Sequence, residues 1–279
     1  MKKVKVYYAK VANMGDILNK DVIEKCFGYK VVRRNYLLGK VSGIGSGLGN
    51  FTLEGPTWKR ILKRLSNVTS PDVNIWGTGF VCYKDKDESL YKSKIRFCAV
   101  RGELSKKRIE KLTGKDLSAL PLGDAGILAS KLLEDEKIEK KYDVGIIAHY
   151  KEKDEPVFKE LYNKFNNSTI IDVQDTPYNV TKKIAECKTI ISSSLHGLII
   201  ADSLRVPNVH IVVTNNLLGD GFKFDDYYSA YGLKHEFKDM NKETVNSLEE
   251  IIDNYKLTDK MVEEKKILML KAFPYQNNK

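Results

Sequence analysis

The sequence has few cysteines and no long apolar run. Its four cysteines form neither a CxxC pair nor a Cys/His cluster with zinc spacing, so we predict reduced thiols and no metal site. No stretch approaches about eighteen consecutive apolar residues, and Lys5 and Lys10 interrupt the first apolar segment. We therefore expect no membrane-spanning helix and no signal peptide, and we predict a cytoplasmic protein.

A basic stripe with interleaved aromatic residues is also missing. The 47 Lys and Arg residues outnumber the 37 Asp and Glu residues, for a net charge of +10, and such an excess favours an anionic substrate, nucleic acid or an acidic membrane surface. The lysines alternate with acidic residues, however, as in KKRIEKLTGK and LLEDEKIEKK. We therefore predict no nucleic-acid partner and keep an anionic substrate and peripheral membrane contact as expectations.

The signal for a nucleotide-binding loop is weak. Glycines alternate in SGIGSGLG at residues 42–49, but their spacing is not GxGxxG, and no P-loop lysine and hydroxyl follow them. We expect these glycines to form a tight turn near a substrate, with Ser46 exposed in it.

Short Val- and Ile-rich segments alternate with helical patterns, which is typical of parallel βαβ units. The expected strands are KVKVYYA, YKVVRR, DVNIWGTG and IRFCAVRG in the first half, and YDVGIIAHY, STIIDVQ, KTIIS and NVHIVV in the second. Helices are expected at GDILNKDVIEKCF and ELSKKRIEKLTG, and from about Pro156, Pro177 and Ser194. The alternation predicts an α/β protein with two Rossmann-like domains.

The charged stretch SKLLEDEKIEKKYD separates the two series of strands. We place the boundary there, with an N-terminal domain at residues 1–138 and a C-terminal domain at residues 139–240. Residues 241–279 are expected to form helices that close the structure. Ligands of open α/β sheets bind beyond the carboxyl ends of the strands, so the loops after the strands are where we look for a site.

One such loop lies in KTIISSSLHGLIIADSLRVP, which indicates a buried strand, a tight turn and a short helix that is apolar on nearly all sides. Ser192, Ser193 and Ser194 fall at the start of that helix, where hydroxyls and backbone N–H groups can bind phosphate or carboxylate. His196 follows in the first turn, where the helix dipole favours a neutral imidazole until an anion binds. His196 is thus a candidate proton donor or phosphate ligand. The alternative is a serine-capped helix with a histidine packed beneath a loop.

This segment, together with GFKFDDYYSAYG at 221–232, resembles the polysaccharide pyruvyltransferases, which transfer pyruvate from phosphoenolpyruvate to sugars as a ketal. Further matching segments follow in the family's order, namely NMGDIL, SGIGSGLG, IWGTGF, AVRGELS, LPLGDAGIL and GIIAHY. The resemblance implies a fold like that of GT-B glycosyltransferases, with the active site in a cleft between two domains. It also implies phosphoenolpyruvate as co-substrate without a further cofactor, and a sugar acceptor in a capsular or exopolysaccharide, or on its lipid-linked precursor at the inner membrane face.

The sequence departs from the family at one position. Relatives often carry arginine directly before Leu-His, where this chain has Ser194, so a bidentate clamp on phosphate is missing and another cation must replace it. The candidates for donor binding are Arg101, just after the strand IRFCAV, and Lys223, in an expected loop. The alternatives are that Arg101 pairs with Glu103 and that Lys223 lies over a tyrosine-rich lid.

Ketal formation needs an acid that protonates the methylene carbon and a base for the sugar hydroxyl. His196 is the candidate acid, and Asp16, in the loop after the first strand, is the candidate base. Asn13 in the same loop and His149 at the end of DVGIIA are candidate acceptor contacts. The alternatives are a helix cap for Asp16 and a satisfied buried histidine for His149.

Tyr227 and Tyr228 are expected in the same loop as Lys223, where a tyrosine ring can stack on a sugar. Other polar residues are expected to have structural roles: His210 inside a strand, His235 in a polar segment, Asp124 in a turn, and Arg205 over helix carbonyls.

Two other functions fit the same architecture, a nucleotide-sugar glycosyltransferase and a non-catalytic carbohydrate-binding protein. Retaining glycosyltransferases often carry two glutamates eight positions apart, as Glu152 and Glu160 are. These two precede the first helix of the second domain rather than its donor loop, so we treat the spacing as coincidence. Pyruvyl transfer is therefore the leading prediction.

Overall fold

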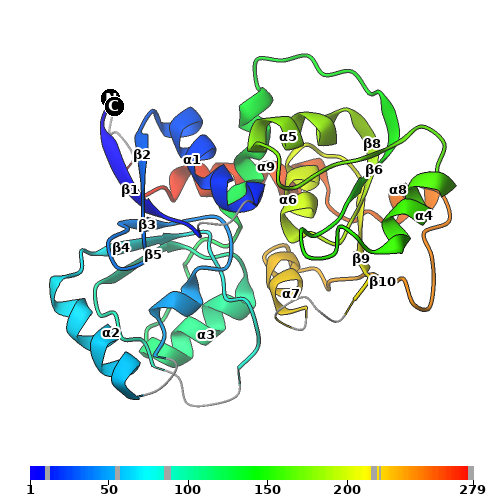
Figure 1. Cartoon of the computed structure of the whole chain (residues 1–279). Coiled ribbons are helices and arrows are strands. Elements are labelled where there is room, and N and C mark those ends of the chain that lie inside the picture. Colours follow the sequence, from blue (N-terminus) through cyan, green and yellow to red (C-terminus); the bar gives the residue numbers. More distant parts are fainter. Residues whose placement is uncertain (10–12, 54–56, 85–88, 215–218, 220, 276–279) are drawn as a thin grey trace.

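The computed structural model describes residues 1–9, 13–53, 57–84, 89–214, 219 and 221–275. Two parallel five-stranded sheets form the two halves of the described chain, in the orders β2-β1-β3-β4-β5 and β10-β9-β8-β6-β7 (Figure 1). The strands are β1 (Lys3–Tyr7), β2 (Lys30–Arg34), β3 (Val41–Ser42), β4 (Val73–Trp76), β5 (Ile95–Ala99), β6 (Tyr142–Ile147), β7 (Ser168–Ile170), β8 (Cys187–Ser192), β9 (Asn208–Val212) and β10 (Lys238–Asp239).

Helices flank both sheets, and the α/β fold with two Rossmann-like domains is confirmed. The helices are α1 (Met14–Phe27), η1 (Leu48–Phe51), α2 (Thr57–Thr69), α3 (Glu103–Thr113), η2 (Ala125–Leu133), α4 (Pro156–Lys164), α5 (Pro177–Ala185), α6 (Leu195–Ser203), α7 (Phe222–Ser229), α8 (Leu248–Asn254) and α9 (Asp259–Lys271).

Local sequence explains most element boundaries. Helices α1 and α3 end at Gly28 and Gly114, whose φ angles of 68° and 65° lie in the left-handed region that glycine tolerates. Helix α5 begins as predicted, with the Thr176 side chain accepting a hydrogen bond from the backbone of Asn179 and a proline in the first turn. The strongly patterned elements therefore form where the sequence places them.

The segment that carries Lys223 differs from its prediction, which was wrong. Residues 222–229, expected to form a loop, form helix α7. Its buried residues, Phe222, Phe224, Asp226 and Tyr227, do not follow the spacing of a single apolar stripe, so the sequence FKFDDYYS shows no clear helical period. Strand β3 and helix α2 were not predicted, since two strand residues show no period and α2 follows no recognised start signal.

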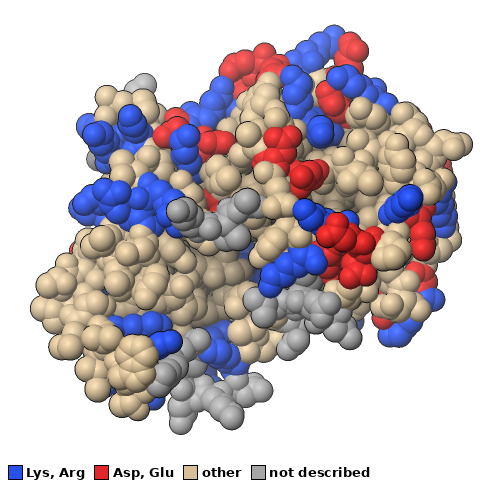
Figure 2. Space-filling view, in the orientation of Figure 1, with Lys and Arg blue, Asp and Glu red and all other residues tan. Residues whose placement is uncertain are grey.

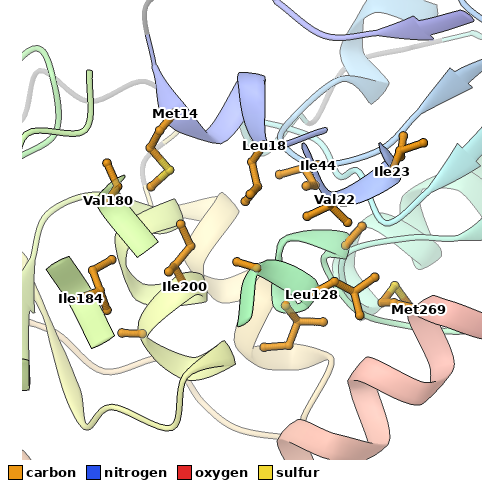
Figure 3. Packing of buried hydrophobic residues seen from close by; sticks show 14 of the residues in the cluster. Met14, Leu18, Val22, Ile23, Ile44, Leu128, Val180, Ile184, Ile200 and Met269 are labelled. Atoms are coloured by element: carbon orange, nitrogen blue, oxygen red, sulfur yellow. The ribbon is translucent and has the colours of Figure 1, made fainter. Parts of the chain in front are cut away.

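One of the hydrophobic clusters spans both domains. Met14 and Leu18 of α1 pack in a single cluster with Leu128 of η2, Ile200 of α6 and Met269 of α9 (Figure 3). Helix α9 thus returns from the second half of the chain to the first. There the Trp76 indole N–H donates to the Met269 carbonyl at 2.8 Å.

A buried ion pair also joins the domains. The Arg101 Nε, just beyond β5, lies 3.0 Å from Oδ2 of Asp226 on α7, and neither side chain is exposed. The Asp226 carboxylate accepts two further hydrogen bonds, from the backbone N–H and hydroxyl of Ser105 at 2.7 and 2.6 Å. Gly102 permits this contact, because a Cβ there would overlap the Asp226 backbone. The position of α7 is therefore fixed by a charge pair whose hydrogen bonds compensate its desolvation.

Asp226→Asn tests this constraint. The amide leaves the buried Arg101 charge without its counter-ion, so we expect the free energy of unfolding to fall by about 3–5 kcal/mol in urea denaturation. Asp135→Asn is the matched control, because the Lys25–Asp135 pair is exposed and its loss should have no measurable effect. Equal effects of the two substitutions would contradict the structural importance of the Arg101–Asp226 pair.

Candidate active site

A cleft of about 230 Å³ opens between the domains, where strands of both sheets end. The first domain contributes the segments after β1 and β3 and the start of α1. The second contributes the end of β6, the β8–α6 turn and α7. The side chains that line the cleft include Tyr7, Asn13, Asp16, Ser46, His149, Lys151, Ser194, His196 and Lys223. The cleft lies where ligands of open α/β sheets bind.

The three serines before α6 have different roles. The Ser192 hydroxyl accepts from the Ser194 backbone N–H and donates to the Ser194 carbonyl, both at 3.0 Å, and the Ser193 hydroxyl accepts from the His149 backbone N–H at 2.9 Å. Both side chains are fully buried, and neither lines the cleft. Ser192 and Ser193 therefore shape the turn, which corrects the prediction that they contact the donor, whereas Ser194 does line the cleft.

The N-terminus of α6 is open toward the cleft. The residues that precede α1, α5, α8 and α9 each cap their helix with a side-chain oxygen, but Ser194 makes no capping bond to α6. The first-turn N–H groups of α6 thus keep their partial positive charge without a side-chain acceptor from Ser194. This arrangement suits an anion.

His196 lies at the contact between the first turns of α6 and α1. Its ring packs directly on Gly15, where an added Cβ would overlap the imidazole. Its Nε2 is inaccessible and has no hydrogen-bond partner among the described residues. Desolvation, reinforced by the cations of Lys223 and Arg101, lowers the pKa of His196 to about 3. The imidazole is therefore neutral near pH 7 in the unliganded protein.

Lys223 lines the second-domain side of the cleft, as Lys151 does. It forms no ion pair or hydrogen bond within the described ranges, and its Nζ lies 5.1 Å from the centre of the Phe224 ring. Desolvation, followed by repulsion from Arg101, lowers the pKa of Lys223 to about 8. An unpaired, largely desolvated ammonium of this kind gains free energy when an anion binds beside it.

Asp16 faces the cleft from the opposite domain. The cap of α1 is Asn13, whose Oδ1 accepts from the Gly15 backbone N–H at 3.1 Å, so Asp16 is not the cap. The Asp16 carboxylate instead accepts a hydrogen bond from the Ala9 backbone. Desolvation raises the pKa of Asp16 to about 6. A carboxylate with this pKa can accept a proton near neutral pH.

His149 lies at the end of β6 beside Lys151. Desolvation, and then the charges of Lys223 and Lys151, lower the pKa of His149 to about 4, so this imidazole is also neutral. Its Nδ1 accepts a long hydrogen bond of 3.3 Å from the Lys151 backbone N–H. Lys151 itself lines the cleft and was missed by the sequence analysis, although its position just beyond a buried strand was a usable signal.

Besides Ser192 and Ser193, three further predicted contact residues lie outside the cleft lining. Arg101 is fully buried and donates to Ser46 Oγ at 2.9 Å as well as to Asp226, so it supports the Ser46 turn rather than facing a ligand, and it does not pair with Glu103. Tyr227 is fully buried, with its hydroxyl 2.8 Å from Asp202. Tyr228 stacks on the His235 ring at 5.4 Å. These placements correct the prediction that they bind donor and acceptor.

The remaining polar residues have structural partners. His210 Nδ1 lies 2.9 Å from His235 Nε2, so His235 belongs to a buried aromatic cluster and not to a polar segment. Arg205 pairs with Glu263 of α9 rather than capping carbonyls. Asp124 accepts from the Gly126 backbone N–H, as a turn residue does.

A larger hollow of about 360 Å³ lies on the second domain, between β9 and α8. Its charged residues largely pair with one another, as in Lys238 with Glu243 and Lys256 with Glu236. Charges that are paired with one another attract an ionic ligand only weakly, so the smaller cleft between the domains is the candidate active site.

Neither a metal site nor a membrane-spanning helix is found in the part of the chain that the structure describes. No group of three or more His, Cys, Asp or Glu side chains there is arranged to hold a metal ion. No helix there is long and apolar enough to cross a bilayer.

Fold and cleft together define a two-domain α/β protein with a cleft at its domain junction that Lys151 and Lys223 line. The chain matches the family model for polysaccharide pyruvyl transferase over residues 16–215. It belongs to this family. It is also 30% identical over 236 residues to an uncharacterised protein of Acanthamoeba polyphaga mimivirus, covering 82% of this chain and 75% of that one.

Solved structures give weaker likenesses. A functionally uncharacterised Klebsiella pneumoniae protein aligns with a TM-score of 0.46 at 14% identity, over 83% of this chain and 88% of that one. The E. coli ADP-heptose LPS heptosyltransferase II aligns with a TM-score of 0.30 at 13% identity, over 97% and 99% of the two chains. At these scores the likenesses add nothing to the two-sheet architecture described above.

The protonation of His196 can be tested through stability. The unfolded chain protonates this imidazole with a pKa of about 6.5, whereas the folded protein does so only near 3, so protons favour unfolding between these values. We expect the free energy of unfolding to fall by about 2 kcal/mol more in the wild type than in His196→Asn between pH 7 and pH 5. Chemical denaturation at both pH values measures this difference, and identical pH dependences would contradict the burial of His196.

Proposed function

We propose that this protein transfers pyruvate from phosphoenolpyruvate to two hydroxyls of a sugar acceptor, with formation of a cyclic ketal and release of phosphate. Family membership supports pyruvyl transfer in general. The observation that carries the proposal for this donor is the meeting of the open N-terminus of α6 with the unpaired Lys223 in one cleft. Phosphoenolpyruvate carries both a phosphate and a carboxylate, and the two features supply N–H donors and a cation for them.

Lys223 and Lys151 take the place of the arginine that relatives often carry before Leu-His. Both lysines line the cleft, whereas Arg101 does not. A lysine binds phosphate as a point charge and without the bidentate geometry of arginine. The α6 N–H groups then orient the donor, while the two ammonium groups mainly contribute charge.

The reaction has a balanced sequence of bond changes. The oxygen of one sugar hydroxyl adds to the central carbon of phosphoenolpyruvate, and the methylene carbon becomes a methyl group by taking up a proton. The bond between that central carbon and the phosphate oxygen then breaks, and the second hydroxyl closes the ketal ring. Of the two hydroxyl protons, one is balanced by the new methyl hydrogen and the other leaves with phosphate. The protein must therefore hold one base and one acid on opposite sides of the donor.

Asp16 is the proposed base. Its pKa of about 6 keeps it mostly ionised at pH 7 and still basic enough to accept a hydroxyl proton. It belongs to the first domain and faces the α6 turn of the second, so the acceptor would lie on the side of Asp16. The Asn13 Oδ1 is occupied in the α1 cap, and His149 and Tyr7 are further side chains of the cleft lining that could position the sugar.

His196 is the proposed acid. Its pKa is lowered by desolvation and by the cations of Lys223 and Arg101. A bound phosphoenolpyruvate anion offsets these cations and raises the pKa of the imidazole, so that it takes up a proton together with the donor. Donor binding and protonation of the acid are thereby coupled.

A phosphate-release assay tests the proposed function. Phosphoenolpyruvate is supplied with galactose-, mannose- and glucose-containing acceptors, and phosphate release that depends on the acceptor is expected. His196→Asn and Asp16→Asn should each lower kcat by about 10²–10⁴-fold while circular dichroism shows retained folding. Glu160→Gln is the matched control, since Glu160 is exposed and outside the cleft. Acceptor-dependent release that survives both cleft substitutions would contradict these roles, and binding of nucleotide sugars without phosphoenolpyruvate would contradict the function.

The pH dependence of donor binding tests Lys223 separately. With a pKa of about 8, Lys223 loses its charge above that pH, so the affinity for phosphoenolpyruvate should fall up to about tenfold per pH unit between pH 8 and 9.5. Lys223→Arg, which stays charged throughout this range, should remove the decline. Calorimetric titration measures both affinities, and a decline that persists in Lys223→Arg would assign it to another group.

A further inference from the structure

Helix α2 presents a continuous apolar face to solvent. Five large apolar side chains recur at helical spacing on one stripe, and between 52% and 75% of each is exposed. They are Trp58, Ile61, Leu62, Leu65 and Val68. No residue of α2 is buried, so this face contributes nothing to the core of the domain.

The helix is attached to the domain by its polar side instead. Lys63 Nζ donates to the Thr52 carbonyl at 2.9 Å, and the Asn67 amide donates to the Ser93 hydroxyl at 3.0 Å. Surface helices of globular proteins normally do the reverse and bury the apolar stripe. The inverted orientation indicates that the apolar stripe has a partner outside the monomer.

The charges of α2 indicate what kind of partner it is. The sequence TWKRILKRLSNVT has four cations, Lys59, Arg60, Lys63 and Arg64, and no acidic residue. At 100° per residue, Lys59 borders one edge of the apolar stripe and Arg64 borders the other. Figure 2 shows the lower left of the molecule, where α2 lies in Figure 1, as largely uncharged surface with Lys and Arg beside it. An apolar stripe flanked by cations matches a partner that has an apolar interior and anionic groups where that interior meets water.

We propose that α2 is a membrane-surface helix, which lies in the headgroup layer of a bilayer containing anionic lipid and inserts its apolar stripe. Trp58 suits this layer, because an indole combines a large apolar ring with one N–H donor. A second copy of the chain fits less well, since two α2 faces in contact bring eight cations together without an acidic residue on either helix. The proposal uses neither the donor nor the pyruvyl chemistry, so its failure and that of the proposed function are distinguishable.

Vesicle sedimentation of the full chain provides the test. Wild-type protein should sediment with vesicles of phosphatidylcholine containing about 30% phosphatidylglycerol, and much less with phosphatidylcholine alone. The double substitution Ile61→Ser and Leu65→Ser should weaken partitioning at least about tenfold. The double substitution Ile252→Ser and Ile267→Ser is the matched control, because these side chains are each 49% exposed on α8 and α9, and partitioning should be unchanged.

Charge and fluorescence give two further readouts. The substitutions Lys59→Gln and Arg64→Gln should each weaken the partitioning of the protein into anionic vesicles about fivefold. The sequence has two tryptophans, of which Trp76 is fully buried, so a blue shift of the emission on adding anionic vesicles reports on Trp58. Trp58→Phe should abolish that shift.

Three outcomes overturn the proposal. The first is wild-type protein that stays in solution with anionic vesicles, and the second is equal sedimentation of the Ile61/Leu65 variant. The third is a wild-type dimer that the same substitutions convert to a monomer without vesicle binding, which would make the stripe an interface between copies. Thermal unfolding of every variant verifies that the fold is retained. Retention is expected because substitutions at exposed positions usually change the free energy of unfolding little.

Discussion

The buried pair of Arg101 and Asp226 is the constraint on which the site depends. It fixes α7 against the first domain, and α7 carries Lys223. The same guanidinium also holds the Ser46 turn from behind the cleft. One charge pair therefore sets the position of a ligand-facing cation on one side and of a glycine-rich turn on the other. Because the pair is fully desolvated and saturated with hydrogen bonds, its geometry tolerates little change.

The two sides of the cleft differ in electrostatic character. The second domain brings Lys223, Lys151 and the first turn of α6. Desolvation by burial, and then the nearby cations, lower the pKa values of His196 and His149 and keep both imidazoles neutral. The first domain brings a carboxylate whose pKa is raised by burial. Groups whose pKa values are shifted in opposite directions across one cleft are suited to accept and donate protons in the same reaction.

The sequence predicted the parallel sheets well, because long Val- and Ile-rich strands and capped helices are determined locally. It also pointed to loops that line the cleft between the domains, since the carboxyl ends of strands converge in any fold of this class. The prediction from sequence failed for residues whose contacts are made by residues far away in the chain. Nothing around Ser192 reveals that its hydroxyl is consumed within the turn, and nothing around Arg101 reveals Asp226 as its partner. Helix α2 was not predicted, and the structure shows both the helix and the apolar face that it turns outward.

The common core of the two halves has a consequence for ligand entry. Domains joined by a small polar interface normally rotate about a hinge, but here α1, η2, α6 and α9 interlock in one apolar cluster. Opening the halves like a clamshell would expose that cluster to water. A ligand of the cleft would therefore gain access through side chains and loops at the mouth, in front of a scaffold that the shared cluster holds together.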